Sequence, residues 1–282
     1  MNGDNADQQT FWTDQTGPTW VAQMAAMDDQ LAPVLAQLLQ RANLRAGEDV
    51  IDIGCGAGTS TLQAMHQVGP TGTVLGADIS ATLLDVARAR AKTFGNVGFL
   101  HADAQTHAFE PAGFDCLISR FGVMFFEDST AAFANMTKAL RPDGRMVFAT
   151  WGAIPENPYF TLPAKVAKDV IGAVPKTDPD GPGPFAFRDP NRVASLLSAA
   201  GLADIEPQEV TLALTPSGDA ASVAALMCEI GPAERALSHF EVDPAGRARL
   251  VHALTEALAP LQTPDGIRIP ARINFFTARK PA

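Results

Sequence analysis

Residues 49–59 read D-V-I-D-I-G-C-G-A-G-T, and this stretch decides the fold class. Asp49–Ile53 is a short apolar run with the length of a buried strand, and three glycines at every second position follow it. A glycine-rich turn between a strand and a helix is typical of open parallel sheets, which bind ligands at their carboxyl edge. The missing side chains let the backbone approach a ligand closely. We expect Thr59 or Ser60 to cap the helix that continues to about Val68.

Short apolar runs continue to alternate with helical segments on the C-terminal side of this turn. Strands are predicted at 73–77, 97–100, 114–119 and 145–151, with helices at 80–92 and 128–140. Ser80 is expected to cap the first of these helices, and Pro142-Asp143-Gly144 is read as a turn. Strands and helices that alternate through short loops predict a doubly wound parallel sheet with helices on both faces, an α/β fold.

The flanking segments predict helices before this unit and a mixed region after it. Thr19–Asn43 has apolar residues at helical spacing, and Pro33 is expected to split the segment or to begin a second helix. Beyond Trp151 the pattern predicts a helix over 157–171, an irregular proline-rich stretch over 172–190, a helix over 191–200, a strand over 203–214, two or three helices over 218–259 and a closing strand over 267–278.

The composition excludes several classes of protein. The 282 residues are 46% hydrophobic, so the chain can bury a large core. With 21 basic and 31 acidic residues the net charge is −10, which argues against binding nucleic acid or an anionic membrane by bulk charge. No apolar run approaches the roughly 18–20 residues of a membrane span, and the N-terminus does not resemble a secretory leader. We therefore expect a cytoplasmic protein, whose three cysteines are too few for a disulfide framework.

Three aspartates follow or end predicted strands, and they should therefore gather at one edge of the sheet. Asp78 ends the second strand, where a carboxylate can accept hydrogen bonds from the ribose hydroxyls of an adenosine ligand. Asp103 follows the third strand and can accept from the adenine amino group or orient its loop. Asp52 precedes the glycine turn and is placed to contact the ammonium of an amino-acid group, directly or through water. The sequence thus predicts an adenosine site at this edge.

Five motifs, in a fixed order along the chain, carry a resemblance to a known family. They are D-I-G-C-G-A-G-T at 52–59, G-A-D-I-S at 76–80, H-A-D-A-Q at 101–105, S-R-F-G-V-M-F-F-E-D at 119–128 and L-R-P-D-G-R-M-V-F at 140–148. Together they resemble the class I S-adenosylmethionine-dependent methyltransferases, in particular the small-molecule group that includes the ubiquinone and menaquinone biosynthesis methyltransferases. The resemblance is specific over 45–151 and thin after 152. Asp143 stands where relatives commonly have a second glycine, and we expect this difference to affect a turn only.

The resemblance implies a Rossmann-like, seven-stranded sheet whose last strand is antiparallel. It implies a helical lid over 1–44 and a methyltransferase domain over 45–282, with helical cap insertions at about 152–190 and 216–265. The implied cofactor is S-adenosylmethionine. Its implied contacts are Gly54, Cys55, Gly56 and Gly58 with the methionine part, Asp78 with the ribose, Ile79 with adenine, Asp103 and Ala104 with the adenine edge, Ser119 and Arg120 beside the sulfonium, and Trp20 and Gln23 in the lid.

Methyl transfer from a sulfonium needs alignment more than it needs a base. Holding the reactants in line can lower the activation barrier by roughly 7–11 kcal/mol. An apolar, aromatic pocket suits this step because ring faces tolerate a cation. The sequence does not identify a general base, and its candidates for a catalytic role are Tyr159, His107 and Arg120. No acidic or histidine cluster has metal-ligand spacing, so we expect no metal.

The sequence therefore predicts in-line transfer of a methyl group to a small organic acceptor, and the charge argues against nucleic acid. The sequence leaves open which atom of the acceptor attacks the methyl group and whether the protein forms a homodimer. One alternative is a nicotinamide-dependent oxidoreductase on a similar sheet. Thr59 and Thr61 stand where its G-x-G-x-x-G motif needs a last glycine, which makes that match poor. Another alternative is a protein that binds S-adenosylmethionine but has a different activity.

Overall fold

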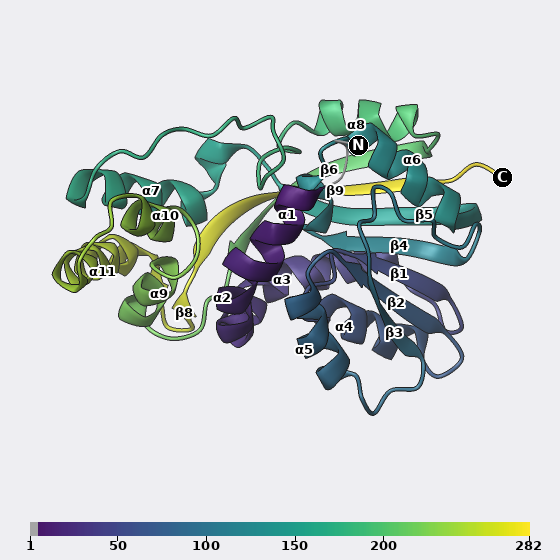
Figure 1. The fold of residues 1–282 in the computed structure, drawn as a ribbon, viewed down its shortest axis with the longest axis horizontal. Coiled ribbons are helices and arrows are strands. Elements are labelled where there is room, and N and C mark those ends of the chain that lie inside the picture. The colour runs from purple at the N-terminus through teal and green to yellow at the C-terminus, as the bar shows by residue number, and fades with distance from the viewer. Residues whose placement is uncertain (1–4) are drawn as a thin grey trace.

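A seven-stranded sheet forms the centre of the computed structural model, which describes residues 5–282 (Figure 1). The strand order is β3-β2-β1-β4-β5-β9-β6, and β9 runs antiparallel to both β5 and β6 while β1 to β5 are parallel. This arrangement confirms the predicted fold class. The strands are β1 (Asp49–Ile53), β2 (Thr73–Asp78), β3 (Val97–His101), β4 (Phe114–Arg120), β5 (Leu140–Trp151), β6 (Ala203–Leu214) and β9 (Ile269–Arg279).

Helices cover both faces of the sheet, which explains why its central strands are nearly continuous apolar runs. In β1 and β4, Ile51, Leu117 and Ile118 are fully buried. Figure 1 shows one set of helices above the sheet and another below it. The upper set is α6 (Ser129–Ala139) and α8 (Pro190–Ala199), and the lower set is α3 (Met24–Ala42), α4 (Thr59–Val68) and α5 (Ala81–Arg90).

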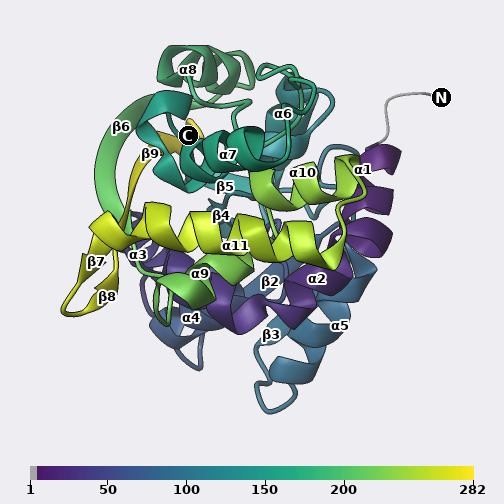
Figure 2. The same cartoon turned by 90° about the vertical axis from the view of Figure 1, so that its left-hand side faces the viewer.

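Two further groups of helices lie beyond the carboxyl ends of the strands. The first, here called the cap, is formed by α7 (Pro158–Val170), α9 (Ala220–Met227), α10 (Pro232–His239) and α11 (Pro244–Leu258) (Figure 2). A small hairpin of β7 (Gln262–Thr263) and β8 (Gly266–Ile267) joins the cap to β9. The second group, here called the N-terminal arm, holds α1 (Ala6–Thr10), a π-helical turn (Phe11–Gln15) and α2 (Gly17–Ala22). Within 5–282, no helix combines the length and apolarity needed to cross a membrane.

The predicted break at Pro33 is wrong, because Pro33 lies inside α3 and the helix boundary falls at Gln23. A proline within a helix leaves the carbonyl four residues earlier without its N–H donor. Here that carbonyl belongs to Asp29, and it accepts a hydrogen bond from the Thr215 hydroxyl at 2.9 Å. A residue 186 positions away thus replaces the missing partner. The sequence pattern around Pro33 could not reveal this compensation.

The predicted cap of α4 is also wrong. Its N-cap is Gly58, which has a φ of 85° and offers no side chain for capping. The hydroxyls of the two predicted caps donate elsewhere, Thr59 to Asp28 and Ser60 to Asp52. By contrast, the predicted Ser80 cap of α5 is confirmed, since its side chain accepts from the Leu83 amide. The fifth strand begins earlier than predicted, at Leu140, and its pairing with β4 is irregular around the expected turn.

Candidate active site

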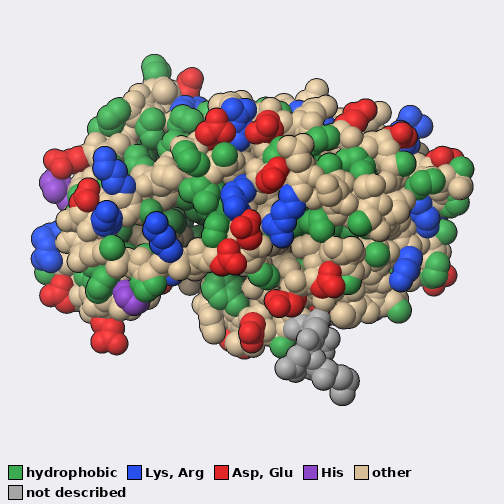
Figure 3. All heavy atoms as spheres, turned by 90° about the horizontal axis from the view of Figure 1, so that it is seen from above, with side chains coloured by type: hydrophobic (Ala, Val, Ile, Leu, Met, Phe, Trp, Pro, Cys, Tyr) green, Lys and Arg blue, Asp and Glu red, His purple; other side chains and the backbone are tan. Residues whose placement is uncertain are grey.

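A large cavity of about 1710 Å³ lies between the carboxyl edge of the sheet, the N-terminal arm and the cap. The view from above shows the surface hollowed between the cap on the left and the sheet on the right, with charged side chains of both signs near the edge (Figure 3). Ligand pockets usually measure about 300–1000 Å³, so this cavity has room for two small molecules. One end is formed by the loops after β1, β2 and β4, and the other by cap residues.

The glycine turn after β1 forms the floor at the sheet end of the cavity. Gly54, Gly56 and Gly58 all have positive φ, at 67°, 54° and 85°. A Cβ atom at Gly54 would lie 2.5 Å from the Gly122 Cα, so these two loops touch by their backbones. A Cβ at Gly56 would meet only the end of Leu83, at 4.0 Å, which leaves open space above this residue. Gly58 instead packs against Ala87 and Phe99 and does not line the cavity.

Asp78 lines the cavity beside this turn and holds its backbone. One carboxylate oxygen accepts from the Gly56 amide at 2.8 Å, and the other accepts from the Ser80 amide at 2.8 Å. Burial raises the pKa of Asp78, and these two backbone donors oppose that effect. Each carboxylate oxygen can accept a further hydrogen bond, so the side chain can still bind a pair of hydroxyl groups.

The loop after β3 is tied to the N-terminal arm. The side-chain amide of Asn5 donates to the Asp103 carboxylate at 2.8 Å, and its oxygen accepts from the Glu127 amide at 2.8 Å. Asn135 of α6 donates to the carbonyls of Ala104 and His107, which fixes the loop from below. Asp103 and Ala104 therefore lie on the cavity wall in a loop held from two sides.

Arg120, at the end of β4, lines the cavity on the other side of the glycine turn. Its Nη2 donates to Asp28 at 3.2 Å, and 15% of its side chain is exposed. Asp28 also accepts from the Thr59 hydroxyl and lies 3.8 Å from the Arg90 guanidinium. This group joins α3, α4 and α5 to β4 beside the turn. Because the two residues of the Arg120–Asp28 pair are 92 positions apart, no local sequence signal identifies Asp28 as part of the site.

Asp52 lies fully buried beneath the turn and outside the cavity lining. One of its oxygens accepts from Ser60 and Thr61, at 2.7 Å each, while the other is buried without a hydrogen-bond partner among the described residues. Burial raises the pKa of Asp52 to about 6, although the two hydroxyls and the positive charge of Arg120 lower it. The pKa of an aspartate in this position changes with any charge that enters the neighbouring cavity.

Aromatic side chains form the wall toward the cap. The rings of Phe121 and Trp151 stack at 4.6 Å, and Tyr159 of α7 stacks on Trp151 at 5.7 Å. Phe121 has a φ of 67°, which is rare for a bulky residue and marks a strained position of the kind found at functional sites. Burial raises the pKa of Tyr159, and the neighbouring Gln30 side chain opposes this shift. A phenol in this state stays protonated at neutral pH and can donate a hydrogen bond.

The structure brings most of the predicted site residues together at the cavity. The residues on its lining are Trp20, Gly54, Cys55, Gly56, Asp78, Ile79, Asp103, Ala104, Arg120 and Tyr159. The predicted residues outside the lining are Gln23, Asp52, Gly58, His107 and Ser119. Ser119 is fully buried and bridges the Ile53 carbonyl and the Gly122 amide, so it holds the two loops together.

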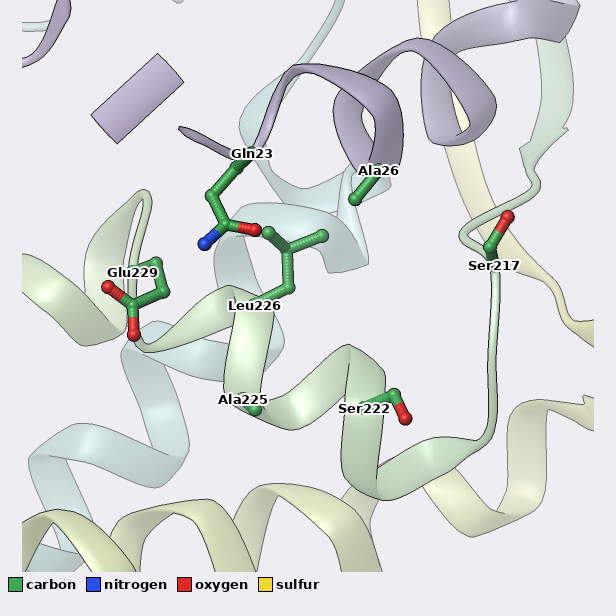
Figure 4. A pocket seen from close by; sticks show the side chains of 7 residues that line it. All are labelled: Gln23, Ala26, Ser217, Ser222, Ala225, Leu226 and Glu229. Atoms are coloured by element: carbon green, nitrogen blue, oxygen red, sulfur yellow. The ribbon is translucent and has the colours of Figure 1, made fainter. Parts of the chain in front are cut away.

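Gln23 lines a separate, smaller cavity of about 240 Å³ between the start of α3 and α9. Figure 4 shows its amide directed toward Leu226, with Glu229 on the same side. Gln23 thus faces the cap, whereas the neighbouring Trp20 faces the large cavity. Helical spacing alone could not distinguish the two, because the regular helix is interrupted at Gln23, between α2 and α3. Within residues 5–282, no group of three or more acidic, histidine or cysteine side chains has the geometry of a metal site.

The glycine turn, the aspartate at the end of β2 and the cavity above them define a nucleotide-binding enzyme of the Rossmann-like class. A family model for a methyltransferase domain matches residues 50–144. Nocamycin O-methyltransferase of Saccharothrix syringae is 31% identical over 67% of this chain and 71% of its own length. A ubiquinone/menaquinone biosynthesis C-methyltransferase of Saccharophagus degradans is 30% identical over 61% of this chain and 74% of its own length.

The fold agrees with these matches. Phosphoethanolamine N-methyltransferase 2 of Haemonchus contortus, solved with S-adenosylhomocysteine, aligns with a TM-score of 0.60 at 18% identity, over 97% of this chain and 59% of that one. The chain belongs to the class I S-adenosylmethionine-dependent methyltransferases, of the type that includes the ubiquinone and menaquinone enzymes. It is a methyltransferase, and its cofactor is S-adenosylmethionine. This result favours methyl transfer over the nicotinamide-dependent alternative.

Proposed function

We propose that the protein transfers the methyl group of S-adenosylmethionine by in-line displacement to a small, largely apolar organic acceptor. The observation that carries this proposal is the single cavity of about 1710 Å³, whose two ends differ in chemistry. The end over the glycine turn offers carboxylates and backbone amides, which suit the cofactor. The end beneath the cap offers aromatic rings, which suit an apolar acceptor. The two relatives named above, whose names describe O- and C-methyl transfer to small molecules, support the same class of acceptor.

The residues present fit the cofactor at the sheet end. The open space over Gly56 admits a ligand close to the backbone, and Asp78 is placed for the ribose hydroxyls. Ile79 would contact adenine, and Asp103 with Ala104 would bind its edge. When bound, S-adenosylmethionine supplies an electrophilic methyl group on a sulfonium. The protein would hold that group in line with the acceptor, and the Phe121 and Trp151 rings would exclude water and tolerate the positive charge.

The acceptor is best identified by incubating the protein with isotopically labelled S-adenosylmethionine and cell extract, followed by mass spectrometry. We expect the label in a largely apolar small molecule, because rings and other apolar side chains outnumber the charged ones, such as Lys168 and Arg235, at the acceptor end of the cavity. Transfer only to nucleic acid or to a highly charged peptide would contradict the proposal. Tight binding of S-adenosylmethionine without any methylated product would instead favour a different activity.

Cofactor affinity should depend on pH through Asp52, whose charge we propose acts on the cofactor ammonium from beneath the glycine turn. Its pKa of about 6 lies above the ordinary value of 3.8, so it becomes protonated as the pH falls from about 7 to 5. Losing this charge should weaken S-adenosylmethionine binding by about tenfold over that range. In the cofactor-free protein Asp52 is more protonated than in the unfolded chain between about pH 4 and 6, so its own contribution to the free energy of unfolding should fall as the pH rises there.

Calorimetry across this pH range tests the effect, with Asp52→Asn as the variant and Asp115→Asn, at the other end of the neighbouring strand, as the control. The variant should lose the pH dependence and the control should keep it. An unchanged pH dependence in Asp52→Asn would mean that another group titrates.

The N-terminal arm, in our proposal, acts as a lid over the cofactor. Asn5 links it to the loops after β3 and β4, and the Trp12 carbonyl accepts from the Ser80 hydroxyl after β2. Replacing Asn5 with alanine should speed the release of S-adenosylhomocysteine several-fold, because three hydrogen bonds that close the arm are lost. Stopped-flow measurement of release tests this, and Gln9→Ala on the exposed side of α1 should leave the rate unchanged.

Tyr159 should position the acceptor and should not act as a base. Its raised pKa keeps the hydroxyl protonated, and the ring lines the acceptor end of the cavity. Once an acceptor is known, Tyr159→Phe should raise its KM by about tenfold, since one hydrogen bond is lost while the stack on Trp151 is kept. S-adenosylmethionine affinity should not change. A large fall in kcat with a shifted pH profile would show that Tyr159 is a base after all.

A further inference from the structure

Arg120 has more hydrogen-bonding capacity than its protein neighbours use. A guanidinium carries five N–H donors, and among residues 5–282 Arg120 makes one hydrogen bond, from Nη2 to Asp28. Nη1 is buried without a hydrogen-bond partner among the same residues. A buried cationic group that lacks partners costs free energy, so such a side chain favours a ligand that supplies them. Arg120 also lines the large cavity, where a ligand can reach it.

Asp28 cannot provide hydrogen-bond acceptors for the remaining N–H donors of Arg120. Its second oxygen already accepts from Thr59 and faces Arg90, whose guanidinium also donates to the Ala57 carbonyl at the glycine turn. Two arginines therefore share one carboxylate at this point. Of the residues in this group, Arg120 lines the large cavity while its Nη1 has no protein partner among residues 5–282.

Asp52 provides the opposite charge close by. It lies on β1, directly next to Ile118 of β4 in the sheet, and the charge of Arg120 acts on it. One of its oxygens is also buried without a partner among the described residues. A positive group on the cavity lining and a negative group beneath the glycine turn thus lie close together, and each has an unused atom. This arrangement is complementary to a zwitterion.

We infer that Arg120 binds the α-carboxylate of the methionine part of the cofactor, across from Asp52 and the ammonium. The inference rests on the proposed placement of the cofactor and deepens it. Asp78 at the end of β2 fixes the ribose end, and the glycine turn after β1 lies between. The next strand in the sheet is β4, so the amino-acid end of the ligand falls beside Arg120. This role differs from the contact with the sulfonium that the family resemblance implied.

The test compares three ligands by calorimetry with the whole protein and with Arg120→Gln. The ligands are S-adenosylmethionine, its decarboxylated analogue and 5′-methylthioadenosine, which lacks the amino-acid part altogether. We expect Arg120→Gln to weaken S-adenosylmethionine binding by about 10- to 100-fold. Binding of the decarboxylated analogue and of methylthioadenosine should change by less than about threefold, because neither has a carboxylate. Arg88→Gln, on the outer face of α5, serves as the control and should leave all three affinities unchanged.

Two results would overturn the inference. Equal weakening of all three ligands would mean that Arg120 supports the loop structurally, and no weakening of S-adenosylmethionine would mean that another group holds the carboxylate. Should Arg120→Gln fail to fold, Arg120→Lys keeps the charge and is expected to retain a preference for S-adenosylmethionine over its decarboxylated analogue. Loss of that preference in a folded lysine variant with intact methylthioadenosine binding would contradict the inference, because lysine keeps the positive charge. A wild-type protein that bound none of the three ligands would contradict the proposed cofactor site itself.

Discussion

Replacing Gly54 with alanine is expected to lower the free energy of unfolding by about 2–5 kcal/mol. A left-handed backbone costs an alanine about 1–2 kcal/mol, and Gly54 has a φ of 67°. The new Cβ would also lie 2.5 Å from the Gly122 Cα, and relieving such overlap typically costs about 1–3 kcal/mol more. Urea unfolding measures the change. Because the two loops that touch here form the cavity floor, S-adenosylmethionine binding should weaken as well.

Gly201, at the end of α8, offers a control for this variant. It also has a positive φ, of 86°, but a Cβ there would meet no atom within 4 Å. Gly201→Ala should therefore cost only the backbone term, about 1–2 kcal/mol, and should leave cofactor binding intact. If the two variants were equally stable, the close approach of the loops at Gly54 and Gly122 would not be a feature of the folded protein.

Replacing Asp78 with asparagine should weaken S-adenosylmethionine binding by about 1.5–3 kcal/mol, or about 10- to 150-fold. The carboxylate both holds the Gly56 and Ser80 amides and faces the proposed ribose site, and an amide can replace only part of this acceptor capacity. Calorimetry with S-adenosylmethionine measures the loss. Asp85→Asn, an exposed aspartate on α5, is the control and should bind normally. Unchanged affinity in the Asp78 variant would remove Asp78 from the cofactor site.

Much of the fold was predictable because its signals are local. The apolar run before the glycine turn and the FDCLIS run at 114–119 identify buried strands, and both coincide with β1 and β4. Asp78 follows from its place at the end of a strand. Where the prediction failed, a distant residue had replaced a local partner. Pro33 stays in a helix because the Thr215 hydroxyl donates to the freed carbonyl. The predicted cap of α4 is missing because the hydroxyls of Thr59 and Ser60 donate to Asp28 and Asp52.

By itself, the sequence determined the parallel sheet, the glycine turn and the family, because each depends on residues that are close together in the chain. Only the tertiary structure decided which of the candidate residues face the cavity. It placed Trp20 on the lining and Gln23 outside it, and it paired Arg120 with Asp28 across 92 positions. The physical reason is that burial and charge pairing depend on the elements that pack against a residue. Those elements here include the cap and the N-terminal arm, which local sequence patterns could not position.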